Sequence, residues 1–218
     1  DLRNPLSEAI GYLGLLVEAL GDVGPENEDY VARIQRALHR VDRLIEAILM
    51  HERATTGQLE RQPCDLNSIV ELVAFEYEPI AAQKSQHLRL EQVATPLVVH
   101  GDSLLLQQAI GNLVSNAIRY TPTEGQITIQ TRDSQDEFTV IVQDNGPGIS
   151  PDDQRRLFHP FVRLKSAGRE RGSGLGLSLV KTVVERHGGR ISVDSSPGQG
   201  TLFAMHLPAH RPAQNGSR

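Results

Sequence analysis

Apolar residues in the first fifty positions recur at alternating steps of three and four, the spacing that places them on one face of an α-helix. The first series is Leu2, Leu6, Ala9, Leu13, Leu16 and Leu20, and the second is Ile34, Leu38, Val41, Ile45 and Ile48. Gly21 to Pro25 separates the two series, so we expect two antiparallel helices joined by a short loop. Pairing with a second copy as a four-helix bundle would bury the apolar seam of this hairpin. Packing of the seam on the rest of the chain is the alternative.

The pattern changes after a polar stretch from Thr55 to Pro63, and we place a domain boundary near residue 62. We expect helices over 66–83, 102–119 and 174–187, and strands over 126–131, 137–143, 190–194 and 201–207. The first two strands are joined by a short turn, which predicts antiparallel pairing. The sequence therefore predicts an α+β chain, in which a helical hairpin (1–62) precedes an α/β domain (63–210) and a flexible tail (211–218).

Charge and cysteine content narrow the class of protein. Lys and Arg total 22 and Asp and Glu total 27, so the net charge is −5, which argues against a protein that binds nucleic acid or coats an anionic membrane. Cys64 is the single cysteine, which excludes an internal disulfide and a Cys-x-x-Cys motif. No apolar run approaches the roughly 18 residues of a membrane span, and no signal peptide is visible. We expect a cytoplasmic setting, without membrane contact from this part of the chain.

Glycines are concentrated in one region: ten of the 19 fall between Gly146 and Gly200. Three of them form the run Gly172-Ser173-Gly174-Leu175-Gly176 before a predicted helix, and backbone amides at a helix N-terminus favour a phosphate. The spacing differs from the dinucleotide fingerprint, and the Gly-Lys-Ser/Thr of a P-loop does not occur. Taken alone, the run is equally compatible with a close helix-packing turn.

Two further groups indicate a ligand near these glycines. Asp144 follows an apolar strand, and Gly146 and Gly148 after it leave room for a flat ligand. The carboxylate could accept a hydrogen bond from an exocyclic amino group of that ligand. An ordinary Asp-Asn-Gly turn is the alternative. Asn112 and Asn116 lie four apart on one predicted helix face, where their amide oxygens could ligate Mg²⁺ that keeps water and phosphate ligands.

A basic segment lies between Arg155 and Arg171, with six basic residues and one acidic residue. This local charge of +5 in a net acidic chain indicates an anion site, and Ser166, Ala167 and Gly168 at its centre are typical of a mobile lid. A solvated flexible loop is the alternative.

Taken in order, these motifs resemble the sequence boxes of sensor histidine kinases. Residues 112–122 resemble the N box, 144–149 the first glycine box, 157–161 the phenylalanine box, 172–177 the second glycine box and 198–201 the third. Five motifs in the family's order make the resemblance specific. It implies a two-layer α/β sandwich of the Bergerat (GHKL) type after the dimeric hairpin, with ATP and Mg²⁺ as cofactors.

The resemblance also implies roles for individual residues. Asp144 would bind the adenine amino group, and Tyr120 would stack near the ring. Asn116, with Asn112, would hold Mg²⁺ against the phosphates, and Arg119 stands where the family often has lysine. The remaining nucleotide contacts that the boxes imply are Gly146, Gly148, Ile149, Phe158, Lys165, Gly172, Ser173, Gly174, Leu175, Gly176, Leu177 and Thr201.

The first residues, Asp1 to Leu6, resemble the H box from one residue after its phospho-accepting histidine, so we expect the sequence to be truncated at that point. The resemblance implies that Asp1 assists phosphoryl transfer and that Asn4 orients water for dephosphorylation of a response regulator. A helix N-cap followed by a first-turn proline is the alternative for Asn4 and Pro5.

The implied function is that of the catalytic core of a dimeric sensor histidine kinase. It would transfer phosphoryl from ATP to the histidine before Asp1, and then to an aspartate in the receiver domain of a response regulator. Related ATPases usually have a glutamate as base at the position of Asn112, so an asparagine there favours transfer over hydrolysis. An ATPase of the same superfamily and a degenerate, dimeric nucleotide-binding scaffold are the alternative functions.

Overall fold

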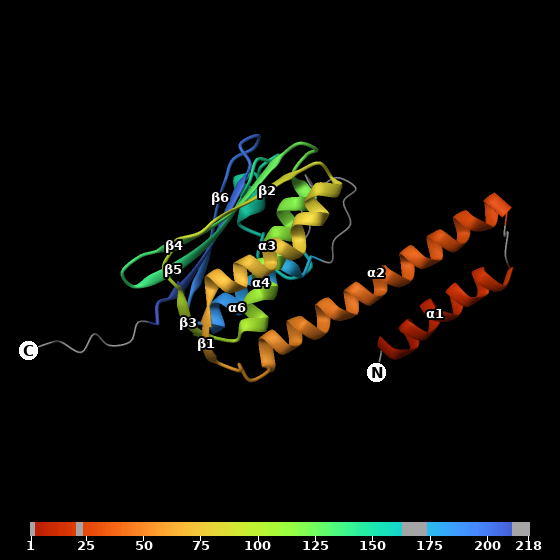
Figure 1. Ribbon diagram of the computed structural model, residues 1–218, viewed down its shortest axis with the longest axis horizontal. Helices are drawn as coiled ribbons and strands as arrows, with labels where there is room; N and C mark the ends of the chain where they lie inside the picture. The colour runs from red at the N-terminus through yellow and green to blue at the C-terminus, as the bar shows by residue number, and fades with distance from the viewer. Residues whose placement is uncertain (1–2, 21–23, 163–173, 211–218) are drawn as a thin grey trace, which may run out of the picture. The chain divides into compact units, whose positions relative to one another are not determined.

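The computed structural model describes residues 3–20, 24–162 and 174–210, and the chain forms two compact units that divide after Glu52. Figure 1 shows helices alone in the first unit and a sheet with helices in the second. This division falls before the predicted boundary near residue 62, because the last turn of the second helix packs with the second unit: Ala54 is completely buried there.

The first unit contains α1 (Arg3–Leu20) and most of α2 (Gly24–Thr56), as the apolar series predicted. Side chains of both series remain exposed: Leu16 on α1, and Ile34, Val41 and Ile48 on α2. A seam that this single chain leaves uncovered agrees with the expectation of a second copy, which stays a prediction.

The second unit is built on a five-stranded sheet with the order β2-β4-β5-β7-β6, in which only β2 and β4 pair parallel. Two short strands, β1 and β3, form a separate antiparallel pair. The elements after α2 are β1 (Gln62–Asp65), α3 (Leu66–Gln83), β2 (His87–Glu91), β3 (Val98–Gly101), α4 (Ser103–Tyr120), β4 (Gln126–Asp133), β5 (Glu137–Asp144), α5 (Pro151–Gln154), α6 (Gly176–Arg186), β6 (Arg190–Ser195) and β7 (Thr201–Pro208).

Helices α3, α4 and α6 cover one face of the sheet (Figure 1). Alternate strand positions supply its apolar layer, and Ile127, Ile129, Val140 and Met205 are completely buried. The layer is aliphatic because the chain has only 4% aromatic residues and no tryptophan. This α+β architecture and the antiparallel β4–β5 pair confirm the sequence predictions, whereas β1, β2 and β3 were not predicted.

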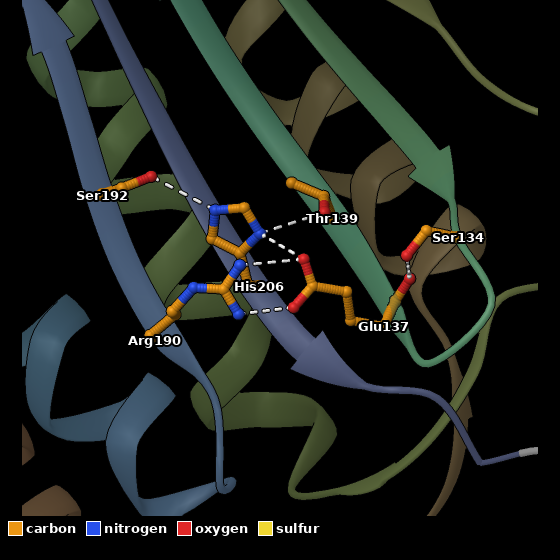
Figure 2. Close-up of polar contacts among 6 residues, drawn as sticks. All are labelled: Ser134, Glu137, Thr139, Arg190, Ser192 and His206. Atoms are coloured by element: carbon orange, nitrogen blue, oxygen red, sulfur yellow. Dashed lines mark hydrogen bonds and ion pairs between the residues drawn. The ribbon is translucent and has the colours of Figure 1, made fainter.

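The other face of the sheet carries a polar cluster that joins three strands (Figure 2). Glu137 on β5 accepts hydrogen bonds from both terminal nitrogens of Arg190 on β6, and lies 3.0 Å from Nδ1 of His206 on β7. The ring of His206 also reaches Thr139 and Ser192. Arg190 and His206 hold the pKa of Glu137 below its ordinary value. The cluster therefore adds cross-strand pairs on a solvated face.

Candidate functional site

Asp144 lies at the end of β5 and turns its carboxylate towards the helix-covered side of the sheet. The residue is 8% exposed, and Oδ1 accepts a hydrogen bond of 2.8 Å from the amide of Gly146. Burial raises the pKa of Asp144, while hydrogen bonds from the backbone of Gly146 and Thr201 oppose that rise. An ionised carboxylate has about four acceptor positions on its two oxygens, so Asp144 can accept a further donor beside these two amides.

Two glycines around Asp144 cannot be replaced without moving the backbone. A Cβ at Gly146 would lie 2.8 Å from Oδ1 of Asp144 and 3.1 Å from the carbonyl oxygen of Tyr120, so the ends of β5 and α4 meet at this point. Gly200 has φ +79°, and a Cβ there would overlap the carbonyl oxygen of Asp144. The predicted first and third glycine motifs therefore pack against each other.

Side-chain hydrogen bonds hold the loop after Asp144 in place. Ser195 Oγ accepts from the amide of Ile149 at 2.9 Å and donates to the carbonyl of Gly200 at 2.7 Å. Gln154 on α5 donates to the carbonyls of Ile149 and Ser195. Neither Ser195 nor Gln154 was among the predicted site residues. Each residue joins a neighbour five residues away to a segment 41 to 46 residues away, and no short motif shows such a contact.

Helix α4 brings four predicted residues to the same end of the sheet. Asn112 and Asn116 are half-buried, one turn apart, and Arg119 and Tyr120 occupy the last turn. Asn112 donates from Nδ2 to the carbonyl of Gln108, which leaves Oδ1 facing the start of α6: a Cβ at Gly176 would lie 2.8 Å from it. The N-box asparagine and the second glycine motif are therefore in contact.

The end of α4 is fixed by two side chains from the segment before β2. Gln86, which is 5% exposed, donates from Nε2 to the carbonyls of Ile118 and Thr121, and Lys84 Nζ also donates to Ile118. These contacts satisfy carbonyls that a helix C-terminus leaves unpaired, and they set the position of Tyr120. Sequence reasoning missed both residues.

The described residues on either side of 163–173 meet in space. The amide of Phe161 donates to the carbonyl of Gly174 at 3.0 Å, and Gly174 has φ +75°. Phe158 packs edge-on against Phe203 of β7, with ring centroids 6.4 Å apart. Leu175 is the N-cap of α6 and has no hydrogen-bonding group in its side chain, so the first amides of α6 are suited to an anion.

Several predicted residues lie outside the described part of the chain. They are Asp1, Lys165, Gly172 and Ser173, together with the side chain of Asn4 and the tail 211–218. The others converge at one end of the sheet: Asp144, Gly146, Gly148, Ile149 and Thr201 on the strands and their loops, and Asn112, Asn116, Tyr120, Leu175, Gly176 and Leu177 on or beside α4 and α6. This arrangement offers an acceptor for an amino group at one side and amide donors for an anion at the other.

A search of the described residues finds no helix long and apolar enough to cross a membrane. Over those same residues, no group of three or more His, Cys, Asp or Glu side chains could hold a metal ion.

Two family models match the chain. Residues 101–211 match the model described as "Histidine kinase-, DNA gyrase B-, and HSP90-like ATPase", and residues 1–57 match the "His Kinase A (phospho-acceptor) domain". Together they include every sequence motif discussed above, and residues 58–100 lie between the two matches.

Similar proteins and structures agree with these matches. The alginate biosynthesis sensor protein KinB of Pseudomonas aeruginosa is 35% identical over 95% of this chain and 35% of its own length, and the phosphate regulon sensor protein PhoR of the same species is 32% identical over 95% and 47%. The chain thus spans between a third and a half of these relatives. Among solved structures, full-length ShkA in complex with AMPPNP superposes with a TM-score of 0.81 at 25% identity, covering 97% of this chain and 45% of that one. Histidine kinase ThkA in complex with response regulator protein TrrA gives 0.70 at 25% identity, over 95% and 59%.

Proposed function

The chain belongs to the sensor histidine kinases of two-component signalling, and from this premise we propose that it is the catalytic core that transfers the γ-phosphoryl group of ATP to a histidine directly before Asp1. The phosphoryl group would then pass to an aspartate of a response regulator. The observation that carries the proposal is the close approach at Gly146, which lies between the buried carboxylate of Asp144 and the backbone at the end of α4.

Adenine recognition would rest on Asp144. The carboxylate already accepts from the amides of Gly146 and Thr201, and one of its remaining acceptor positions would take the hydrogen bond of the adenine amino group. Tyr120 is 37% exposed, and its backbone carbonyl lies near Gly146, so we place its ring as the stacking partner of the base. Gly146 and Gly148 would let the ring approach the backbone.

The phosphates would lie between α4 and the start of α6. The amides after Leu175 would bind phosphate oxygens, and the half-buried Arg119 would compensate their charge. Asn112 and Asn116 fit Mg²⁺ as neutral oxygen donors, because this ion binds few protein ligands and keeps water and phosphate oxygens. When bound, Mg²⁺ would neutralise charge on the transferring phosphates. Lys165, Gly172 and Ser173 are proposed as further phosphate contacts.

In the transfer step, an imidazole nitrogen of the acceptor histidine forms a bond to the γ-phosphorus as the bond to the β–γ bridging oxygen breaks and ADP leaves. Asp1 would take the imidazole proton or hold the ring in the reactive tautomer. The carboxamide of Asn112 cannot act as a base for water, which favours transfer to the imidazole over hydrolysis. Asn4 would orient water when the phosphorylated regulator is hydrolysed.

The partners would be a second copy of the chain and a receiver domain. Apolar residues that α1 and α2 leave exposed, such as Leu16 and Ile48, would form the dimer as a four-helix bundle. The same helices carry the acceptor position, so the receiver domain would dock on them to reach the phosphohistidine.

The experiment extends the chain by a histidine before Asp1 and incubates it with Mg²⁺ and ATP labelled at the γ-phosphate. We expect a phosphoprotein label that is stable to base and labile to acid, and that moves to a cognate receiver domain. A matched protein with glutamine at the added position should bind ATP equally well and carry no label. An unlabelled histidine-extended protein would contradict the proposal.

The two alternative functions give different results in the same experiment. A superfamily ATPase would release inorganic phosphate from either protein with no labelled intermediate. A degenerate scaffold would fail to bind ATP in calorimetry. The position of Asn112 against Gly176 opposes the first alternative, and the close packing of Gly146 and Gly200 around Asp144 opposes the second.

A further inference from the structure

Arg186, the last residue of α6, donates hydrogen bonds to the end of α2. Its Nη1 lies 2.6 Å from the carbonyl oxygen of Ala54, and its Nη2 lies 2.6 Å from the carbonyl oxygen of Gly57. These carbonyls belong to the C-terminus of α2, where helical carbonyls lack partners and the helix dipole favours a cation. One guanidinium therefore joins the ends of two helices that are about 130 residues apart in the sequence.

The segment after α2 returns a contact of the same kind. Nη2 of Arg61 donates to the carbonyl of Arg186 at 2.5 Å. Arg186 therefore binds the C-terminus of α2, and Arg61, which follows α2, binds the C-terminus of α6. The amide of Glu60 lies 3.4 Å from Oδ2 of Asp102, the N-cap of α4. Residues 53–61 are thus bound to the end of α6 and to the start of α4, two helices of the ATP-binding unit, before the chain continues into β1.

His187 completes this junction from the inside. Its Nε2 accepts from the amide of Asp102 at 2.9 Å, and its Nδ1 donates to the carbonyl of Val183 at 2.7 Å, which requires a neutral ring. Burial lowers the pKa of His187, and the nearby Arg61 and Arg186 lower it further, while Asp102 opposes them. His187 therefore fixes the end of α6 to the start of α4, and Arg186 is the residue directly before this fixed histidine.

The division of the chain agrees with these contacts. The two units separate after Glu52, inside α2, although the irregular segment begins only at Gly57. Ala54 is completely buried, and the amide of Gly57 continues the helix by donating to Arg53 at 3.0 Å. The last turn of α2 consequently moves with the ATP-binding unit, and residues 58–61 do not act as a free linker.

We propose that Arg186 is a positioning residue for phosphoryl transfer. It couples α2, the second helix of the phospho-acceptor domain, to α6, the helix whose first amides would bind the nucleotide phosphates. The proposal rests on the proposed function. Helix α6 has 11 residues, so about 16 Å separate Arg186 from the amides after Leu175. Bending or rotation of α2 is transmitted through Arg186 to α6, and the covalent connection through residues 58–61 contributes little.

An arginine is needed for this role because its planar fork reaches two carbonyls at once. Lysine would keep the charge and a long side chain, but its single ammonium cannot span the carbonyls of Ala54 and Gly57 in the same way. Arg186→Lys is therefore an informative partial variant, and Arg186→Gln removes the charge and the fork. Lys181→Gln is the matched control, because Lys181 lies on the same helix and its Nζ pairs with the exposed Glu185 at 3.7 Å.

The test uses the histidine-extended chain in a two-by-two design, with Arg186→Gln as one change and a Gly-Ser-Gly insertion between Gly57 and Gln58 as the other. Arg186→Gln should lower the autophosphorylation rate at saturating ATP at least about fivefold, because misplaced reactants react slowly, while the ATP dissociation constant stays within about twofold. The insertion alone should change the rate less than about twofold, and both changes together should lower it by more than the product of the single effects. Arg186→Lys should be intermediate, and Lys181→Gln should match the unmodified chain.

An unchanged rate in Arg186→Gln, or a large loss from the insertion alone, would overturn the proposal. Hydrogen exchange at the amide of Gly57 tests the same contacts without any activity, and it should accelerate in Arg186→Gln and not in Lys181→Gln. If the unmodified, histidine-extended chain carries no label, the proposed function fails while the exchange experiment still reports on Arg186. A fall in ATP affinity that parallels the fall in rate would assign Arg186 a structural role only.

Discussion

Asp144→Asn should separate nucleotide recognition from folding, because the proposed function and the stability of the fold make opposite demands on this carboxylate. The carboxylate is 8% exposed, and burial raises its pKa above the ordinary value of 3.8. A raised pKa means that the folded state binds the proton more tightly than the unfolded state. The native chain therefore gains stability as the pH falls through the raised pKa, and the ionised group destabilises the fold at neutral pH. A neutral amide removes that cost and can still accept from the amide of Gly146.

Nucleotide binding should respond in the other direction. A hydrogen bond to a charged acceptor contributes about 1.5–3 kcal/mol, so replacing the carboxylate should raise the ATP dissociation constant about 10- to 150-fold. The introduced amide can place its NH₂ group towards the base, where it would donate to the O6 of inosine triphosphate. The preference for ATP over inosine triphosphate should therefore shrink or reverse.

Calorimetry with both nucleotides and thermal unfolding without nucleotide together check this prediction. The control is Asp194→Asn, since Asp194 is exposed on β6 and its variant should bind ATP normally. Unchanged ATP affinity in Asp144→Asn would refute the assignment of the adenine acceptor. Loss of affinity together with a lower unfolding temperature would refute the argument from burial.

Three further predictions concern the fold. In denaturant unfolding, Gly200→Ala should lower the free energy of unfolding by more than about 2 kcal/mol, and Gly198→Ala by about 1 kcal/mol. Both glycines have φ near +80°, but only a Cβ at Gly200 would overlap backbone atoms, those of Asp144. His187→Gln should flatten the pH dependence of stability below about pH 6.5. The pKa of His187 is lowered in the folded chain, so the unfolded state binds the proton first, and the native chain loses up to about 1.4 kcal/mol of stability per pH unit as the pH falls. Equal slopes of stability against pH in both proteins would contradict this. Glu137→Gln should leave the unfolding midpoint within about 2 °C, because exposed ion pairs contribute little, and a larger change would mean that the cluster on the bare face stabilises the sheet.

The parts of the fold that the sequence predicted are those with a strong local period. The steps of three and four identified α1 and α2, and the alternation of Phe138, Val140 and Val142 identified β5. Strand β2 was missed because Leu88 and Leu90 alternate over only five residues and pair parallel with the distant β4. The pairs of β1 with β3 were missed for the same reason: strands of four residues carry too few positions for a pattern.

The candidate site divides in a similar way. Motifs of adjacent residues predicted Asp144, Gly146 and Asn112, because turns, close approaches and helical spacing are local properties of the chain, and their role in binding stays a prediction. The residues that hold the motifs together, such as Gln86 and Gln154, act through hydrogen bonds to carbonyls that can belong to any residue type. Such partners leave no trace in the sequence, and only the fold reveals them.

The pairing of β5 with β7 has a consequence for how the chain acquires its function. It places Asp144 opposite Thr201, so the proposed adenine acceptor and one of its amide donors come from strands separated by α5, α6 and β6. The β4–β5 and β6–β7 hairpins are local and can form early, whereas this pairing closes a long loop and forms late. Partly folded chains therefore lack the adenine site, and ATP at a hundredfold excess over its dissociation constant would stabilise the finished fold by about 2.7 kcal/mol. In the cell, the nucleotide would stabilise newly made chains in which β5 has paired with β7 over chains in which this pairing is still missing.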